Sequence, residues 1–371
     1  MGEHMITWAR ACTAALALLI AGCAGDLGSP TQTEPAEEPA AGTEATDGLG
    51  GLAAEPGPDR TEQLVELARE DGDPMLVYSS NPPEEFQAII GAFEEEYGLT
   101  VEHYRAGGTD IIQRVTQEVQ AGAQTADVIS ANDNVVYALD ASEGITSPFV
   151  SEHHDAYDTD LRVSENSYPV YVNYWMWAYN TDMVDEDELP RTYEDLLDER
   201  WQGEITIARY TDWFAGMHQI LGDDAEEYLD RLAAQDPLIA DQFTPAILPV
   251  ISQERSLTIS TTSGVLAGER EGGAPIDGYF PDDPTVSRAQ SVAWINDGGN
   301  PAGGLLFAEF LLHPEHGQVF MREANRVPAH DAVAADPAEL RPDEFVPIDY
   351  AAFLPEQAMW ESRFDQVLIN R

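Results

Sequence analysis

The chain has 371 residues, which is long for one compact domain and suits two lobes of roughly 150 residues each. Its formal net charge of −50 comes from 68 acidic and 18 basic residues, and because the sequence contains no lysine, every basic residue is an arginine. Such a chain lacks the cations that replace the counterions of a nucleic acid, and nucleic acid is therefore excluded as a partner.

The first residues predict export and lipid attachment. Arg10 precedes an apolar run, residues 11–21, and the run leads into the sequence Ile20-Ala21-Gly22-Cys23. This pattern is typical of a signal peptide that is cleaved before a lipid-bearing cysteine. A run of about a dozen residues spans only ~18 Å as a helix, against a hydrocarbon core of ~30 Å, so a transmembrane helix is the weaker interpretation. We expect residues 1–22 to be removed and lipidated Cys23 to anchor the protein at the extracytoplasmic face of the cell membrane.

The segment that follows predicts a tether. Residues 23–60 consist mainly of Ala, Gly, Pro, Thr and Glu, which cannot bury a core, and we expect them to be disordered. The two cysteines are Cys12, in the removed segment, and Cys23, so the mature domain has no thiol for a disulfide, a metal or a nucleophile. High salt screens repulsion between carboxylates, and the acidity therefore indicates a halophilic source, with a GC-rich genome as the alternative explanation for arginine without lysine.

The first half of the folded region alternates strands and helices. After a short amphipathic helix near residue 64, the pattern predicts strands at 75–78, 99–104 and 127–130, separated by helices that carry Phe86 to Tyr97 and Ile111 to Val119. Thr109 is expected to cap the second of these helices. This order is typical of a parallel sheet with right-handed crossovers.

The second half begins with an aromatic stretch, residues 171–179, which is too apolar for an exposed strand and is expected to run through the middle of the molecule. We then expect a helix from Thr192 to Trp201 and strands at 203–208, 257–260 and 286–295. Further helices are expected at 214–221, 225–234, 301–312, 314–323 and 355–368.

A ligand of an open α/β sheet binds beyond the carboxyl ends of the strands, where following helices present free N–H groups. This rule selects four segments at the ends of the strands, and Tyr174 in the aromatic stretch adds a phenol. The candidate ligand-binding residues are Ser79, Ser80, Asn81, Asn132, Asp133, Tyr174, Arg209, Tyr210, Trp213, Thr261 and Thr262. Two of these residues have competing interpretations, because Trp213 equally suits a core position and Asp133 repels an anion unless a cation accompanies it.

The sequence offers little for an enzyme. It contains no Gly-x-Ser-x-Gly turn, no His-Glu-x-x-His pair and no phosphate-binding loop with Lys. We expect no catalytic residue and no cofactor, and a membrane-anchored extracellular hydrolase is the alternative from another class.

Several stretches resemble the extracellular solute-binding proteins of ABC importers, in the two-lobed group that contains the ferric-ion binders. The matching stretches are VYSSNPPEEFQAIIGAFEEEYGLTVE, GGTDIIQRVTQEVQAGAQTADVI, WAYNTDMV, LPRTYEDLLDERWQGEITIA, LAAQDP, PTVSRAQSVAWI and PAGGLLFAEFLLHPEHGQ. The resemblance covers residues 61–328 and implies a type II periplasmic-binding-protein-like α/β fold. In this fold each lobe is a central sheet flanked by helices, and the lobes close on the ligand by hinge motion.

The resemblance also implies partners and boundaries. We expect a monomer that passes its ligand to an ABC permease in the membrane. Lobe 1 is expected at 61–168 plus 288–371, lobe 2 at 169–287, and the crossover strands at 171–179 and 286–295.

Two ligand classes stay open. Ferric binders of the group carry adjacent tyrosines, where this chain has Ser260 to Ser263, and a first-lobe glutamate, where it has Asn132. Tyr174 and Tyr210 remain as phenolates for a ferric ion. The other class is a small organic or oxyanion solute.

Overall fold

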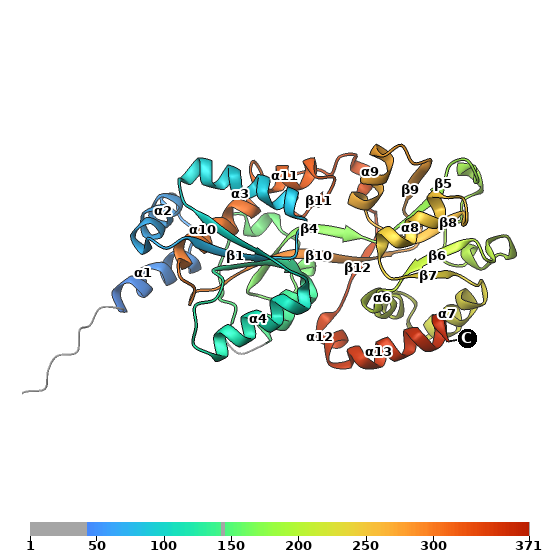
Figure 1. Ribbon diagram of the computed structural model, residues 1–371, viewed down its shortest axis with the longest axis horizontal. Coiled ribbons are helices and arrows are strands. Elements are labelled where there is room, and N and C mark those ends of the chain that lie inside the picture. The colour runs from blue at the N-terminus through green and yellow to red at the C-terminus, as the bar shows by residue number, and fades with distance from the viewer. Residues whose placement is uncertain (1–42, 142–144, 371) are drawn as a thin grey trace, which may run out of the picture. The chain divides into compact units, whose positions relative to one another are not determined.

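The computed structural model describes residues 43–141 and 145–370, while the predicted signal peptide and Cys23 lie outside these residues. Two sheets organise the chain (Figure 1). The first sheet has the strand order β11-β4-β10-β3-β1-β2, and β12 pairs with β10. Its strands are β1 (Met75–Ser79), β2 (Val101–Arg105), β3 (Val128–Asn132), β4 (Ser167–Tyr174), β10 (Thr285–Trp294), β11 (Val327–Pro328) and β12 (Phe345–Pro347).

The second sheet has the order β7-β6-β8-β5-β9. Its strands are β5 (Met176–Asn180), β6 (Ile205–Ala208), β7 (Leu238–Ala240), β8 (Leu257–Thr261) and β9 (Ile276–Tyr279). In each sheet the central parallel strands are joined through helices. β5 pairs antiparallel with β8 and β9, and β10 pairs antiparallel with β3 and β4 and parallel with β12. The expected α/β fold of two sheets flanked by helices is confirmed.

Helices cover both sheets. Those that follow or pack on the first sheet are α2 (Arg60–Asp71), α3 (Pro83–Tyr97), α4 (Gly108–Gln120), α5 (Asp133–Asp140), α10 (Pro301–Leu312) and α11 (Gly317–Glu323). Those of the second sheet are α6 (Thr211–Leu221), α7 (Ala225–Ala234), α8 (Phe243–Ile251) and α9 (Ser263–Glu271). Within the described ranges, no helix is both long enough and apolar enough to cross a membrane.

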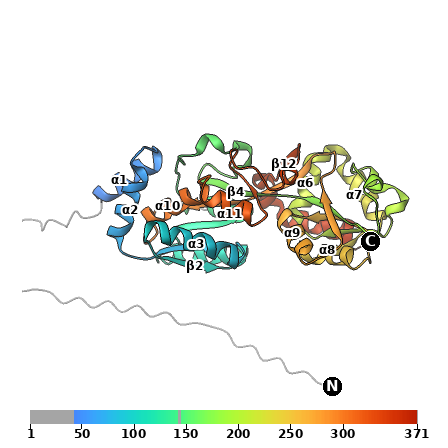
Figure 2. The same ribbon diagram turned by 90° about the horizontal axis from the view of Figure 1, so that it is seen from above.

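The expected tether is partly wrong, because helix α1 (Thr43–Ala54) lies inside it. Leu49 and Ala53 are buried in the same apolar cluster as Leu64 of α2 and Ala302 of α10. Both views show α1, α2 and α10 together at one end of the first sheet (Figures 1 and 2). Three glycines in α1 weaken its helix propensity, so this contact with the core and not the local sequence stabilises the helix.

The aromatic stretch forms two strands instead of one. β4 belongs to the first sheet and β5 to the second, and Trp175 lies between them. The backbone N–H of Trp175 donates to the carbonyl of Val286 (3.0 Å), and Oγ1 of Thr285 donates to the carbonyl of Trp175 (2.6 Å). The chain therefore crosses between the sheets at two adjacent points, at Trp175 and at the start of β10.

Three local expectations are corrected. Residues 192–201 form two 3₁₀ turns, Asp195–Leu197 and Glu199–Trp201, and no α-helix. Gly107 and not Thr109 is the N-cap of α4. The last predicted helix is α13 (Gln357–Phe364), preceded by α12 (Tyr350–Phe353) and followed by a π turn, Asp365–Ile369.

The C-terminal segment packs on the second sheet's helices. Tyr350, Phe353, Phe364 and Leu368 are buried in one cluster with Trp213 and other residues of the second sheet. Figure 1 shows α13 beside α6 and α7. The lobe boundaries given above stay a prediction, and these contacts favour residues 350–368 as a part of lobe 2.

Candidate functional site

Four helices begin directly after strands of the two sheets. α3 and α5 follow β1 and β3 in the first sheet, while α6 and α9 follow β6 and β8 in the second. The N-cap residues Asn132, Tyr210 and Thr262 make no side-chain capping bond. Each helix therefore starts with free backbone N–H groups and the positive end of its dipole.

The amides at the end of β1 form a buried network with β10. Oδ1 of Asn81 accepts from Nε2 of Gln290 at 2.6 Å and from Oγ of Ser130 at 3.2 Å, and Oγ of Ser80 lies 3.2 Å from the same Nε2. Asn81 is 1% exposed, and in the described part of the chain its Nδ2 has no hydrogen-bond partner. Because Oδ1 already accepts from two donors, the group of this amide that is still available for a hydrogen bond is the donor Nδ2.

Ser79 is fully buried, and its Oγ is hydrogen-bonded to Nε2 of His103 at 2.7 Å. Its hydroxyl therefore faces β2 instead of an open surface. Asn132 is half-buried at the start of α5.

Asp133 is bound to β10. Its Oδ2 accepts from the N–H of Ala289 at 2.9 Å, and its Oδ1 accepts from Oγ of Ser291 at 2.6 Å. Burial raises the pKa of Asp133 to about 7, although both hydrogen bonds and the nearby Arg288 act in the opposite direction. This carboxyl therefore holds α5 to the crossover strand.

The start of α6 carries its own counter-charge. Nη1 of Arg288, on β10, donates to Oδ2 of Asp212 at 2.9 Å, and the hydroxyl of Tyr350 donates to the same oxygen at 3.2 Å. The guanidinium also lies over the rings of Trp175 and Tyr210, at 5.3 and 5.2 Å from their centroids. We call these residues, Tyr210, Asp212, Arg288 and Tyr350, the α6 junction.

The start of α9 is arranged differently. Arg326, between α11 and β11, is bound by Glu85 of α3, with Nη2–Oε1 at 2.8 Å and Nε–Oε2 at 3.4 Å. A Cβ placed on Gly264 would lie 2.5 Å from Nη1 of Arg326, so the guanidinium touches the first turn of α9. We call Glu85, Thr261, Thr262, Gly264 and Arg326 the α9 junction.

Four further predicted site residues have the following surroundings. Trp213 is 2% exposed within the second core, and Tyr174 is packed against Phe280 and Phe345. Arg209 is on the surface, where it pairs with Asp365 at 2.7 Å. Tyr210 is half-buried against the ring of Phe243, with 4.4 Å between the centroids.

Sequence reasoning missed Arg288, Gln290 and Arg326. Arg288 is the charged residue of the buried strand β10, and a charge within a buried strand is a signal that a partner is needed. Gln290 is one of several polar residues of this strand and gives no such signal. Arg326 has no comparable local pattern, because its partners come from α3, β4 and α9.

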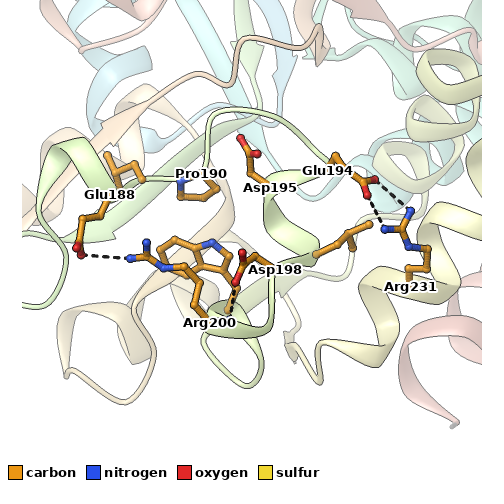
Figure 3. A pocket seen from close by; sticks show the side chains of 10 residues that line it. Glu188, Pro190, Glu194, Asp195, Asp198, Arg200 and Arg231 are labelled. Atoms are coloured by element: carbon orange, nitrogen blue, oxygen red, sulfur yellow. Dashed lines mark hydrogen bonds and ion pairs between the residues drawn. The ribbon is translucent and has the colours of Figure 1, made fainter.

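A separate hollow of about 490 Å³ lies in the second sheet's region, between the turns at 186–201 and α7 (Figure 3). Its two arginines already have partners, since Arg200 pairs with Glu188 at 3.2 Å and Arg231 with Glu194 at 2.5 Å. Both pairs are exposed. None of the predicted site residues lines this hollow.

Comparisons with known proteins agree on family and fold. The model of a family described as bacterial extracellular solute-binding protein matches residues 88–345. An iron- and citrate-bound protein from Trichodesmium is 23% identical, with a TM-score of 0.67, over 80% of this chain and 99% of that one. Iron-bound HitA from Pseudomonas aeruginosa is 21% identical, with a TM-score of 0.67, over 78% and 98%. The periplasmic binding protein AfuA from Actinobacillus pleuropneumoniae, with fructose-6-phosphate bound, is 19% identical, with a TM-score of 0.63, over 80% and 98%.

Proposed function

The chain belongs to the bacterial extracellular solute-binding proteins, and from this premise we propose that it captures a small solute between its two lobes and delivers it to an ABC permease. The observation that carries the proposal is the meeting of both sheets' helix starts at β10. Gln290 and Ala289 of this strand bind Asn81 and Asp133 of the first sheet's helix starts, while Arg288 binds Asp212 of α6. A rotation at β10 therefore changes the distance between the two groups of helix starts.

The ligand-binding surface we propose is smaller than the set expected from sequence. Asn81, Asn132, Tyr210, Thr261 and Thr262 remain as groups at helix starts whose side chains are not fully engaged elsewhere. Ser80 borders this surface through Gln290. Trp213 and Arg209 are left out because the first is core and the second is paired on the surface.

Between the two ligand classes, the chemistry of these groups favours an organic or oxyanion solute over a bare ferric ion. Ferric iron favours carboxylate and phenolate oxygens. Here the carboxylates of Glu85 and Asp212 are paired with arginines. Burial raises the pKa of Tyr174 to about 12 and raises that of Tyr210, so both phenols resist losing the proton. Among residues 43–141 and 145–370, no three His, Cys, Asp or Glu side chains are placed to hold a metal ion.

Binding without chemistry is the proposed activity. The nearest arrangement to a hydrolase pair is Ser79 with His103, but Ser79 is 0% exposed and its hydroxyl cannot reach a substrate. Burial, and then the charge of Arg105, lowers the pKa of His103, which makes it a weaker base. The hydrolase alternative therefore has no accessible nucleophile at this pair.

The family places the folded domain outside the cytoplasm. We propose that lipid on Cys23 anchors it there after removal of residues 1–22, as the sequence pattern indicates. Mass spectrometry of the mature N-terminus is expected to find a diacylated Cys23. A Cys23→Ser protein that stays in the membrane fraction would contradict the anchor.

The binding proposal is tested on protein purified without refolding. Native mass spectrometry is expected to detect a retained small solute, and adding that solute back to stripped protein is expected to raise the Tm. Ser80→Ala and Tyr210→Ala are expected to weaken binding. Arg231→Ala, in the hollow of Figure 3, is the control that keeps full affinity. If Arg231→Ala loses affinity while Ser80→Ala and Tyr210→Ala keep it, the solute binds in the hollow and the proposed binding surface is wrong.

A further inference from the structure

The α9 junction brings a cation against the positive end of a helix. The guanidinium of Arg326 touches the first turn of α9, since a Cβ on Gly264 would lie 2.5 Å from Nη1 and 2.9 Å from Cζ. A helix N-terminus bears a partial positive charge and favours anions, so a guanidinium beside it raises the electrostatic energy unless negative charge is near both. The first turn of α9 contains no acidic residue of its own.

The negative charge at this place comes from the other sheet's region. Glu85, in the first turn of α3, binds Arg326 through two contacts, at 2.8 and 3.4 Å. The two side chains are 22% and 14% exposed, and the ring of Tyr171 covers one face of the guanidinium at 5.3 Å. Glu85 occupies Nη2 and Nε, whereas Nη1 is the nitrogen that lies against Gly264.

Two buried groups near the same helix starts add hydrogen-bonding capacity. Thr261 is 0% exposed and directly precedes the N-cap Thr262, and no described residue binds its Oγ1. Asn81, just before α3, has the unpaired donor Nδ2. Leaving a buried polar group unpaired is unfavourable, so these positions favour an incoming acceptor.

The α6 junction shows why the inference concerns α9. There a cation also lies at a helix start, but Asp212 stands in the first turn of α6 itself and Tyr350 completes its hydrogen bonding. The charge is thus balanced within the junction by a residue that moves with the helix. At the α9 junction the balancing carboxylate belongs to α3 and is not fixed to α9.

We propose that Arg326 and the start of α9 form the subsite for an anionic oxygen group of the ligand, such as a phosphate, sulfonate or carboxylate. Glu85 is the internal substitute that holds Arg326 until such a group replaces it. This inference rests on the proposed function, because it names the chemical class of the solute bound between the lobes. Gly264 is required since a side chain there would displace the guanidinium from the helix.

The test is isothermal titration of the purified full chain with inorganic phosphate, fructose 6-phosphate and citrate, with glucose as the neutral probe. At ~1 M NaCl the Debye length is about 3 Å, so the net charge of the chain is screened and contacts at the subsite dominate. At least one of the three anions is expected to bind saturably, and glucose is not. Comparing the three anions shows whether the subsite binds free phosphate, an esterified phosphate or a carboxylate.

Four variants make the test specific. Arg326→Gln is expected to lower affinity for the bound anion about 10-fold or more, as for a lost charged hydrogen bond. Glu85→Gln is expected to raise it several-fold, because it removes the competing carboxylate. Gly264→Ala is expected to lower it at unchanged charge. Arg322→Gln, which removes one positive charge from the last turn of α11, is expected to keep the affinity of the wild type.

Unchanged anion binding in Arg326→Gln, or weaker binding in Glu85→Gln, overturns the inference. If Arg326→Gln does not fold, the double variant Glu85→Gln/Arg326→Gln removes both charges and takes its place, with the same loss expected. A retained solute without an anionic oxygen group overturns the inference and leaves the proposed function intact. A wild type that retains no solute and binds none added contradicts the proposed function as well.

Discussion

The two junctions differ in where the balancing charge is fixed. At the α6 junction Arg288 faces Asp212, which belongs to the helix whose end it neutralises, and both side chains are 10% exposed. At the α9 junction Arg326 faces Glu85, which belongs to another helix and is 22% exposed. At the α6 junction the helix itself supplies the carboxylate that pairs with the arginine, whereas at the α9 junction both charges come from the first sheet's region and α9 supplies neither.

The largest effect is expected from breaking the α6 junction. Asp212→Ala leaves Arg288 buried without a counter-charge, and we expect a loss of about 3–5 kcal/mol in the free energy of unfolding. Chemical denaturation followed by circular dichroism measures it. The control is Asp365→Ala, which removes the partner of surface residue Arg209 and is expected to cost less than about 1 kcal/mol. Equal losses in the two variants would remove the distinction between buried and surface pairs.

The pH dependence of stability concerns Asp133, which binds β10 at Ala289 and Ser291, on either side of Gln290. Asp133 has a folded-state pKa of about 7, raised by burial from 3.8, so the folded protein keeps a proton that the unfolded chain releases. Its contribution to the unfolding free energy is therefore fully present below about pH 4 and is lost as pH rises to about 7. In Asp133→Asn the free energy of unfolding is expected to change less with pH between about pH 4 and about pH 7.

Urea denaturation at a series of pH values measures the effect of Asp133. Ser291→Ala removes a hydrogen bond that lowers the pKa of Asp133, so the sloping part is expected to extend to higher pH. A wild-type profile that rises between pH 4 and 7 with no difference in Asp133→Asn would show that this carboxyl is ionised in the folded protein.

Gly216 and Gly264 are helical glycines whose nearest side chains differ in rigidity. A Cβ on Gly216 of α6 would lie 2.8 and 2.9 Å from the γ carbons of Val286, a branched side chain on β10, and we expect Gly216→Ala to cost about 1–3 kcal/mol. In Gly264→Ala the Cβ meets only the end of a flexible arginine, so stability is expected to change by less than about 1 kcal/mol. Thermal and chemical denaturation of both variants test whether Gly216→Ala loses more stability than Gly264→Ala. The reverse order would mean that Arg326 is held rigidly.

A smaller loss of stability than in Asp212→Ala is expected at Glu85. Glu85→Ala is expected to cost about 1–2 kcal/mol, because Arg326 keeps some solvent contact and the ring of Tyr171. Added inorganic phosphate is expected to recover this loss in Glu85→Ala but not the loss in Asp212→Ala. Thermal unfolding with increasing phosphate, at constant ionic strength, makes the comparison. Equal recovery in both variants would argue for a general salt effect.

Much of the fold followed from local pattern. The segments predicted as strands at 75–78, 257–260 and 286–295 became β1, β8 and β10. The helices α3, α7 and α10 followed from spacing of about 3.6 residues. Helix α1 did not, since three glycines hide it and only contact of Leu49 and Ala53 with the core stabilises it.

The candidate site was predicted less completely. The rule that ligands bind beyond the ends of strands selected the segments after β1, β3, β6 and β8, and in the structure these segments precede the helices α3, α5, α6 and α9. That a ligand binds there stays a prediction. It could not tell that Trp213 packs inward or that Asp133 binds β10, because both depend on which element lies on the other side.

The sequence by itself determined the alternation of strands and helices in the first half of the folded region, the excess of negative charge and the family, since these follow from residue types and their spacing along the chain. Only the tertiary structure decided which charges meet. Glu85 and Arg326 are 241 residues apart, and Asp212 and Arg288 are 76 apart, so neither pair leaves a local pattern. Their partners are set by how the two sheets and the C-terminal segment pack, and that packing makes one arginine structural and leaves the other for a ligand.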